Sequence, residues 1–145
     1  MKPKTYYMEN KIINIKSRTS GLEIMNEKLA TLVEEWNISK DVAFSMNLAL
    51  EEIATNIINY GYKGKDDYDI IIRFTLEKHK LRIQIKDGAK EFNPLDMKAP
   101  DDIGKPLEER GIGGLGIHLV KKFTDNFSYR RSNNKNIVTL TKSLD

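Results

Sequence analysis

The sequence predicts an α+β fold, a two-layer sandwich in which helices cover one face of a single sheet. Two observations lead to this expectation. Apolar residues recur at helical spacing through most of the chain up to Tyr60, whereas from Ile70 onward they alternate with polar residues. Helical segments that precede a strand-rich second half are typical of an α+β domain. We therefore expect one mixed, mostly antiparallel sheet.

A short strand and a long helix are expected first. Residues 10–15 alternate weakly between polar and apolar and are predicted to form an edge strand. Ser20, with Glu23 three residues later, forms the capping-box pattern that starts a helix. Apolar residues at helical spacing continue to about Trp36, so we expect the helix to end there.

Ser39 is expected to cap a second helix that ends near Tyr60, with Gly61 as its stop signal. The alternating segments that follow are predicted as strands, at 70–76, 81–85, 127–131 and 137–141. A third helix is expected at 114–123. The segment 88–113 is rich in Gly, Pro and charged residues, and a loop of this length is usually functional or mobile.

Length and composition fit one globular domain over residues 1–145, with a core at about 10–142. The chain is 39% hydrophobic and 31% charged, and its formal net charge is +3. Charges of both signs interleave without a basic stripe, so we expect no nucleic-acid partner. The sequence has no Cys and two His, which excludes disulfide bonds and a zinc cluster of these residue types.

The sequence shows no sign of a membrane segment. No apolar run approaches the roughly 20 residues that span a bilayer. The first residues, Met1–Thr5, lack the apolar core of a signal peptide. We therefore expect a cytoplasmic protein without membrane association.

Glu52 and Asn56 are four residues apart on the predicted second helix, so their side chains project from the same face. Ala49 and Ile53 flank this face. A carboxylate beside an amide oxygen offers a general base and a hard ligand for Mg²⁺. The same spacing also fits an exposed polar pair on a solvated surface.

Asp87 has the same parity as the apolar residues of its predicted strand, 81–85, so we expect it on the core face of the sheet. A carboxylate there needs a hydrogen-bond donor. The exocyclic amino group of a bound nucleobase would provide one. Alternatively, the strand ends at Lys86, and Asp87 starts a turn with Gly88.

A glycine-rich run leads into the predicted third helix, at Gly111-Ile112-Gly113-Gly114-Leu115-Gly116. Glycines allow backbone amides to approach a phosphate, and a helix N-terminus adds donors and a favourable dipole. Such a run also occurs in plain turns and hinges. Neither a Walker A motif nor a dinucleotide fingerprint is present.

In this order, the three features resemble the GHKL (Bergerat-fold) ATPase superfamily, and within it the branch of anti-sigma-factor serine kinases. Residues 47–58 resemble its N box, with the Glu-x-x-x-Asn core at Glu52 and Asn56. Asp87 with 92–94 resembles the G1 region, and 113–119 the G2 segment. The resemblance covers about residues 10–142 and implies a Bergerat-fold sandwich that binds ATP and Mg²⁺.

The resemblance also implies roles for individual residues. In the family the N-box glutamate is the general base and the asparagine holds Mg²⁺ on the phosphates, which assigns these roles to Glu52 and Asn56. The G1 aspartate, here Asp87, bonds the adenine amino group. The phosphate side and a lid at about 88–113 are assigned to Arg110, Gly111, Gly113, Gly114, Leu115 and Gly116.

Two positions depart from the family pattern. The usual Asp-x-Gly of G1 is Asp87-Gly88-Ala89 here, so the close backbone approach at the glycine is altered. The adenine-binding Thr of the last strand is replaced by Asn136, whose amide still offers hydrogen bonds.

The resemblance implies a serine protein kinase that phosphorylates an anti-anti-sigma (STAS) partner and sequesters a sigma factor, and it also implies a homodimer. The main alternative is a nucleotide-gated module that holds a protein partner without phosphorylating it. Glu52 favours the kinase, because a pure binding module needs no base. A histidine-kinase catalytic domain is a third hypothesis.

Overall fold

The computed structural model describes residues 8–96 and 115–145, and all structural statements below concern these residues. The five strands form one sheet in the order β1-β2-β3-β5-β4. Their bounds are β1 Met8–Lys16, β2 Asp69–Glu77, β3 Lys80–Asp87, β4 Asn126–Ser132 and β5 Lys135–Ser143. All four pairings between neighbouring strands are antiparallel, so the described sheet contains no parallel pair. The expected edge strand is β1, which pairs only with β2.

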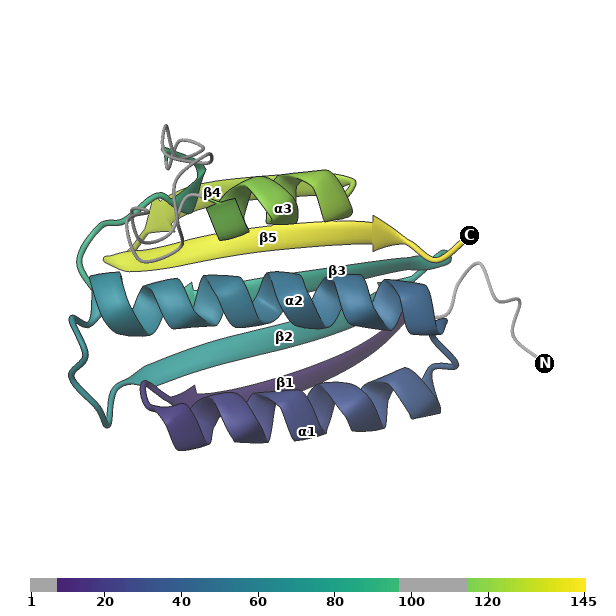
Figure 1. The fold of residues 1–145 in the computed structure, drawn as a ribbon, viewed down its shortest axis with the longest axis horizontal. Coiled ribbons are helices and arrows are strands. Elements are labelled where there is room, and N and C mark those ends of the chain that lie inside the picture. The colour runs from purple at the N-terminus through teal and green to yellow at the C-terminus, as the bar shows by residue number, and fades with distance from the viewer. Residues whose placement is uncertain (1–7, 97–114) are drawn as a thin grey trace, which may run out of the picture.

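Three α-helices lie on one face of this sheet (Figure 1). They are α1 Thr19–Glu35, α2 Lys40–Asn56 and α3 Leu115–Phe123. A π-helical turn, Ile57–Gly61, continues α2, and a 3-10 turn, Pro94–Asp96, follows β3. The predicted two-layer α+β sandwich is therefore confirmed.

The core lies between the helices and the inner face of the sheet. Each inner strand alternates as the sequence predicts, so that Ile70, Ile72 and Phe74 of β2 are fully buried. From the helices, Met46 and Leu50 of α2 pack against these strands as part of one hydrophobic cluster. Burial of this apolar face of α2 fixes where its other, polar residues point.

The capping box predicted at Ser20 and Glu23 is wrong, because α1 begins at Thr19 and its N-cap is Arg18. The backbone of Arg18 is extended, and its carbonyl accepts hydrogen bonds from the amides of Gly21 and Leu22. The first helical turn therefore forms two residues earlier than expected. Ser39, in contrast, caps α2 as predicted, and its Oγ accepts from the amide of Val42 at 3.3 Å.

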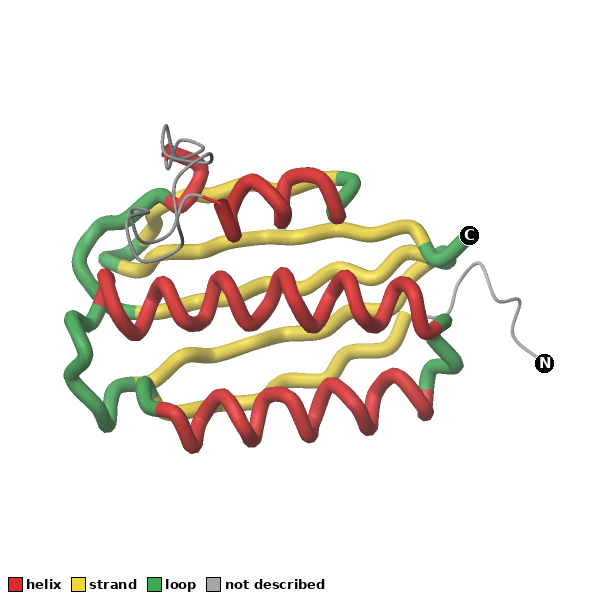
Figure 2. The backbone as a smooth tube through the Cα atoms, viewed as in Figure 1, coloured by secondary structure: helices red, strands yellow, loops and turns green. Residues whose placement is uncertain are grey.

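Three chain segments meet at one end of the sandwich, at the left in Figure 2. The end of α2, the end of β3 and the start of β5 lie there. In the sheet register Asp87 of β3 is opposite Asn136 of β5 on one side and opposite Ile70 of β2 on the other. This end of the molecule holds most of the described residues that the sequence predicts as functional.

Candidate functional site

A shallow recess lies between α2, the segment after β3, and β5, and the free volume inside it is about 10 Å³. This volume is far below the ~300–1,000 Å³ of small-molecule sites, so the lining side chains must move apart before a small molecule can enter. Apolar side chains form most of its wall, and three polar side chains converge on it. The lining consists of Ile53, Asn56, Ile57, Gly61, Asp87, Phe92, Pro94, Asn136 and Val138.

Asp87 is the last residue of β3 and is 3% exposed. The core-facing position that the strand pattern predicts is therefore confirmed. Its Oδ1 accepts hydrogen bonds from the amide of Ala89 at 2.9 Å and from Nδ2 of Asn136 at 3.0 Å. Burial raises the pKa of Asp87, while these two hydrogen bonds and the charges of Arg131 and Lys135 oppose the shift. The result is a carboxyl group held on the wall of an apolar recess.

Asn136 holds the segment after β3 against the sheet. Its Nδ2 donates to Asp87 and also to the carbonyl oxygens of Ala89, at 3.4 Å, and Lys90, at 2.9 Å. Its Oδ1 accepts from three donors, the Tyr129 hydroxyl at 2.6 Å, Arg131 at 3.0 Å and the Phe92 amide at 3.3 Å. A side-chain amide has two N–H groups and two lone pairs. The hydrogen-bonding capacity of Asn136 is thus already used within the protein.

Glu52 and Asn56 lie one turn apart near the C-terminal end of α2, and Nδ2 of Asn56 donates to Oε1 of Glu52 at 3.4 Å. Asn56 is buried and lines the recess, whereas Glu52 is half-buried. Burial raises the pKa of Glu52, the hydrogen bond from Asn56 opposes the shift, and the nearby charge of Glu51 adds to it. The pair is not a solvated surface feature.

Gly116, in the first turn of α3, packs directly on the carboxyl group of Glu52. A Cβ atom at this position would overlap the carboxyl carbon and both oxygens of Glu52. A side chain at this position would force the carboxyl group of Glu52 to move. The structure therefore brings Gly116 and Glu52 together, as the sequence motifs predict for the two sides of one site.

Ala89, which replaces the expected glycine, is not among the described residues that line the recess. Its side chain is buried against Gly61, and a Cβ atom at Gly61 would lie 3.0 Å from the Cβ of Ala89. Such a distance is tighter than ordinary van der Waals contact, so the two positions have room for one methyl group. The glycine at the end of the π turn thus accommodates the departure from the family pattern.

An aromatic pair covers one side of the recess. The rings of Tyr60 and Phe92 stack with 6.0 Å between their centroids and 26° between their planes. The hydroxyl of Tyr60 is buried and has no hydrogen-bond partner among the described residues. Phe92 belongs to the segment that Asn136 holds, so this wall of the recess depends on Asn136 as well.

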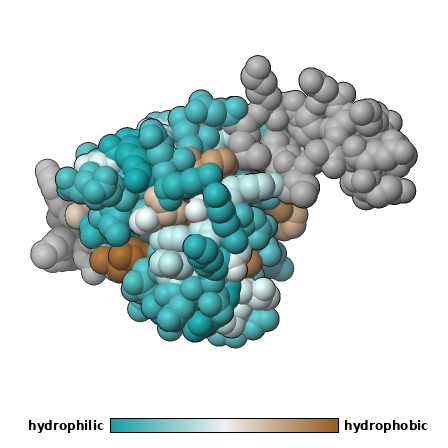
Figure 3. Space-filling model, turned by 90° about the vertical axis from the view of Figure 1, so that its left-hand side faces the viewer, coloured by the Kyte–Doolittle hydropathy of each residue, from teal (hydrophilic) through white to brown (hydrophobic). Residues whose placement is uncertain are grey.

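The end of the molecule that carries the recess faces the viewer in Figure 3. Its visible surface is largely hydrophilic, with small hydrophobic areas between polar side chains.

The described residues contain no cluster of three or more His, Cys, Asp or Glu that could hold a metal ion. An Mg²⁺ site built from one protein ligand and the phosphates of a nucleotide needs no such cluster. The amide oxygen of Asn56 is a hard ligand of the type that Mg²⁺ prefers. The residues present therefore fit a magnesium ion that arrives with its nucleotide.

The sequence model of a known family, described as Histidine kinase-like ATPase domain, matches residues 15–142. The chain belongs to this family. Among curated members, the serine-protein kinase RsbW of Listeria monocytogenes serotype 4a (strain HCC23) is 24% identical over 122 residues, which cover 81% of this chain and 78% of the relative. RsbW of Bacillus thuringiensis (strain Al Hakam) is 30% identical over 116 residues, with 78% and 72% covered. These relatives confirm the resemblance to the anti-sigma-factor kinase branch.

Two solved structures share the fold of this chain. Their sequence identities are low, so the likeness concerns the fold alone. The structure of the RsbU and RsbW domains of Rv1364c from Mycobacterium tuberculosis aligns with a TM-score of 0.66 at 13% identity, over 94% of this chain and 32% of that chain. The SiaB-SiaC complex from Pseudomonas aeruginosa gives 0.59 at 12% identity, over 91% and 88%.

Part of the predicted ATPase site lies outside the described residues. This applies to Arg110, Gly111, Gly113 and Gly114, and to the expected lid beyond Asp96. Leu115 begins α3. No described helix is long and apolar enough to cross a membrane.

Three residues near Asp87 were not predicted from the sequence: Tyr129, Arg131 and Tyr62. Tyr129 and Arg131 of β4 point to the same face as Asp87 and bond to Asn136. Their parity with Phe127 in an alternating strand was a usable signal, because a cation on a core-facing position needs partners. Tyr62, whose hydroxyl bonds the amide of Gly88, gave no signal in the sequence.

Proposed function

We propose that this protein is an ATP- and Mg²⁺-dependent serine protein kinase that phosphorylates an anti-anti-sigma partner with a STAS domain. Residues 10–142 would form its single ATP-binding domain, with the lid at about 88–113. The relatives support the activity, since they are named as serine-protein kinases. The partner class, a sigma factor as second partner, and a homodimer follow from the family resemblance.

One observation carries the proposal. Residues from three separate parts of the sequence meet at the same end of α2: Glu52 and Asn56 of α2 itself, Asp87 of β3 and Gly116 of α3. Asp87 and Asn56 line the recess, and Glu52 lies one helical turn from Asn56 against α3. A structural role alone would not require a half-buried carboxylate beside a buried amide.

Glu52 is suited to accept the proton of a serine hydroxyl as that hydroxyl attacks a phosphoryl group. Burial shifts the pKa of Glu52 toward neutral pH, compared with that of a solvated carboxylate. A general base works best when its pKa lies near the pH of the reaction. Asn56 orients it by a hydrogen bond to Oε1. Bound Mg²⁺ would neutralise charge on the phosphates, with Asn56 as its protein ligand.

Asp87 is suited to select adenine. Its Oδ1 is engaged by Ala89 and Asn136, and no hydrogen bond among the described residues uses Oδ2. A carboxylate oxygen on the wall of an apolar recess accepts from the adenine amino group. Asn136 would act through Asp87 and the 89–92 segment, as a positioning residue.

The activity is tested by incubating the protein with labelled ATP, Mg²⁺ and a STAS-domain partner at pH 8. We expect label on the partner, and a loss of at least about 100-fold in Glu52→Gln, as is usual for removal of a general base. Glu51→Gln is the matched control, because Glu51 is exposed on the same helix. Undiminished transfer by Glu52→Gln would refute the role of Glu52.

Nucleotide binding is tested separately by titration calorimetry with and without Mg²⁺. We expect Mg²⁺-dependent binding of ATP that Asp87→Ala abolishes and Asn56→Ala weakens. Binding without phosphotransfer would replace the kinase by the nucleotide-gated module. Absence of binding would refute the nucleotide site and leave a Bergerat fold that serves protein binding alone.

A further inference from the structure

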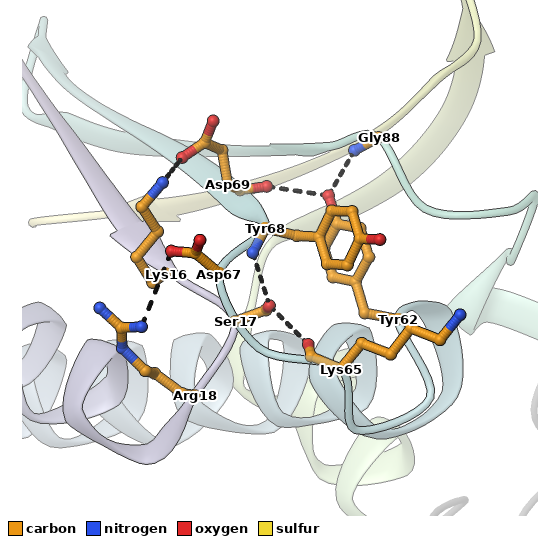
Figure 4. A network of polar contacts seen from close by, with 9 residues as sticks. All are labelled: Lys16, Ser17, Arg18, Tyr62, Lys65, Asp67, Tyr68, Asp69 and Gly88. Atoms are coloured by element: carbon orange, nitrogen blue, oxygen red, sulfur yellow. Dashed lines mark hydrogen bonds and ion pairs between the residues drawn. The ribbon is translucent and has the colours of Figure 1, made fainter.

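Tyr62 follows the π turn at the end of α2, and its side chain joins two strands (Figure 4). The ring is buried and stacks on Tyr68 with 4.8 Å between centroids and 8° between planes. The hydroxyl donates to the carbonyl oxygen of Asp69 at 2.9 Å and accepts from the amide of Gly88 at 2.8 Å. One hydroxyl group thus bridges the start of β2 and the residue after β3.

The carbonyl of Asp69 and the amide of Gly88 lie at the position that would come next in the β2–β3 ladder. The last paired residues are Ile70 and Asp87, so a continued register would place Asp69 opposite Gly88. In antiparallel sheets, opposed residues exchange direct N–H···O=C bonds at alternate positions. Here the phenol oxygen takes the place of the direct bond from Gly88 to Asp69. The ladder therefore ends, and the strands separate, immediately after Asp87.

The bridge acts on Asp87 because it holds Gly88, the first residue of the turn, whereas Asn136 and Arg131 hold the residues that follow. The amide of Ala89 bonds back to Oδ1 of Asp87, and the amide of Gly88 bonds to Tyr62. Both amides that follow Asp87 consequently have defined partners. Without the hydroxyl, the amide of Gly88 could pair directly with Asp69 and draw the turn toward β2.

A network of polar contacts holds Tyr62 itself in place (Figure 4). The amide of Ser17 donates to the carbonyl of Tyr68 at 2.9 Å, and the amide of Tyr68 donates to Oγ of Ser17 at 3.1 Å. The Ser17 hydroxyl in turn donates to the carbonyl of Lys65 at 2.8 Å. Ion pairs join the same two segments, between Lys16 and Asp69 and between Arg18 and Asp67. The loop that carries Tyr62 is thereby anchored to the corner between β1 and α1.

We propose that Tyr62 is a positioning residue for nucleobase recognition, whose hydroxyl ends the β2–β3 ladder and holds the carboxyl group of Asp87 on the wall of the recess. The inference rests on the proposed nucleotide site. It assigns Tyr62 no contact with the nucleotide, because the hydroxyl already bonds to Asp69 and Gly88.

The test compares binding of ATP with that of purine riboside triphosphate, which carries hydrogen in place of the 6-amino group. Tyr62→Phe keeps the ring and its stack on Tyr68 but removes the hydroxyl. We expect wild-type protein to prefer ATP, and this preference to fall roughly fivefold in Tyr62→Phe, the effect of about one hydrogen bond. The affinity for the analogue should not change. Tyr68→Phe is the control, because no described hydrogen bond uses the exposed Tyr68 hydroxyl.

Several outcomes would overturn the inference. A Tyr62→Phe protein that keeps the wild-type preference, or loses affinity equally for both nucleotides, contradicts the positioning role and leaves the nucleotide site standing. Wild-type protein that binds neither nucleotide contradicts the proposed function as well. Hydrogen exchange of the Gly88 amide in the wild-type protein, followed by NMR, needs no variant: protection supports the bridge, and exchange at the rate of an open chain overturns it.

Discussion

Asn136 donates a hydrogen bond from Nδ2 to Oδ1 of Asp87 at 3.0 Å, across the register pair that joins β3 and β5. Both side chains are 3% exposed. The contact fixes the carboxyl group from the sheet side, and the same amide holds the backbone from Ala89 to Phe92. The residue that replaces the family threonine is therefore the centre of a buried polar network.

Replacement of Asn136 by Ala is expected to destabilise the fold, because it removes several hydrogen bonds of buried and half-buried groups at once. Tyr129, Arg131 and Asp87 would all lose a hydrogen bond. The combined loss should lower the free energy of unfolding by about 2–3 kcal/mol. Urea denaturation measures the loss, and Asn126→Ala, at an exposed position of β4, should stay within about 0.5 kcal/mol of wild type. A similar small change in both variants would contradict the importance of the network.

Gly61 and Ala89 are expected to be energetically coupled, because there is room for one methyl group between them. Gly61→Ala should cost about 1–2 kcal/mol by overpacking. Ala89→Gly in the same molecule should recover most of this loss, giving a coupling energy of about 1 kcal/mol in a double-mutant cycle. Urea denaturation of the four proteins measures it. Additive effects would show that the two residues are independent.

The elements of the fold follow from local sequence patterns. The change from helical to alternating spacing locates α1, α2 and the strands β2 to β5, since burial of one face imposes those periods. The parity of Asp87 predicts its buried position for the same reason. The start of α1 was predicted incorrectly because the extended backbone of Arg18 provides its first acceptor, and no side chain is involved.

The contacts around Asp87 were harder to predict because they depend on strand order. Asn136 and Arg131 reach the site only because β5 lies beside β3 and β4 lies beside β5. Tyr62 bonds Gly88 across 26 residues of sequence. Such long-range neighbours are set by packing of the whole sheet, and single-sequence periodicity carries no information on them.

Gly116→Ala is expected to impair phosphotransfer while the fold persists. Alanine in a helix is normally favoured over glycine by about 0.5–1 kcal/mol. Here the added Cβ would displace the Glu52 carboxyl group. A misplaced general base lowers the rate by about 10- to 100-fold. Labelled-ATP transfer and thermal unfolding measured together separate the two effects, with Lys122→Ala on the same helix as control. Transfer at the wild-type rate in Gly116→Ala would show that the carboxyl position is not critical.

Glu52→Gln is expected to stabilise the protein at neutral pH, although the proposed mechanism requires the carboxylate. Burial raises the pKa of Glu52 in the folded protein above its ordinary value of 4.5, so the folded state holds this proton more tightly than the unfolded chain does. The favourable contribution of the protonated carboxyl is therefore complete below pH 4.5 and is lost as pH rises through the folded pKa.

Glutamine has no charge to lose and still accepts the hydrogen bond from Asn56. The difference in unfolding free energy between Glu52→Gln and wild type should therefore be small at pH 4 and grow as pH rises to 8, and solvent screening of the half-exposed carboxyl should keep it below about 1 kcal/mol. Urea denaturation across this pH range measures it. Glu23→Gln, at an exposed position of α1, should differ from wild type by less than about 0.5 kcal/mol throughout. A Glu52→Gln protein that becomes less stable than wild type as pH rises would mean that the ionised carboxylate stabilises the fold, and that its burial is not the dominant influence on its pKa.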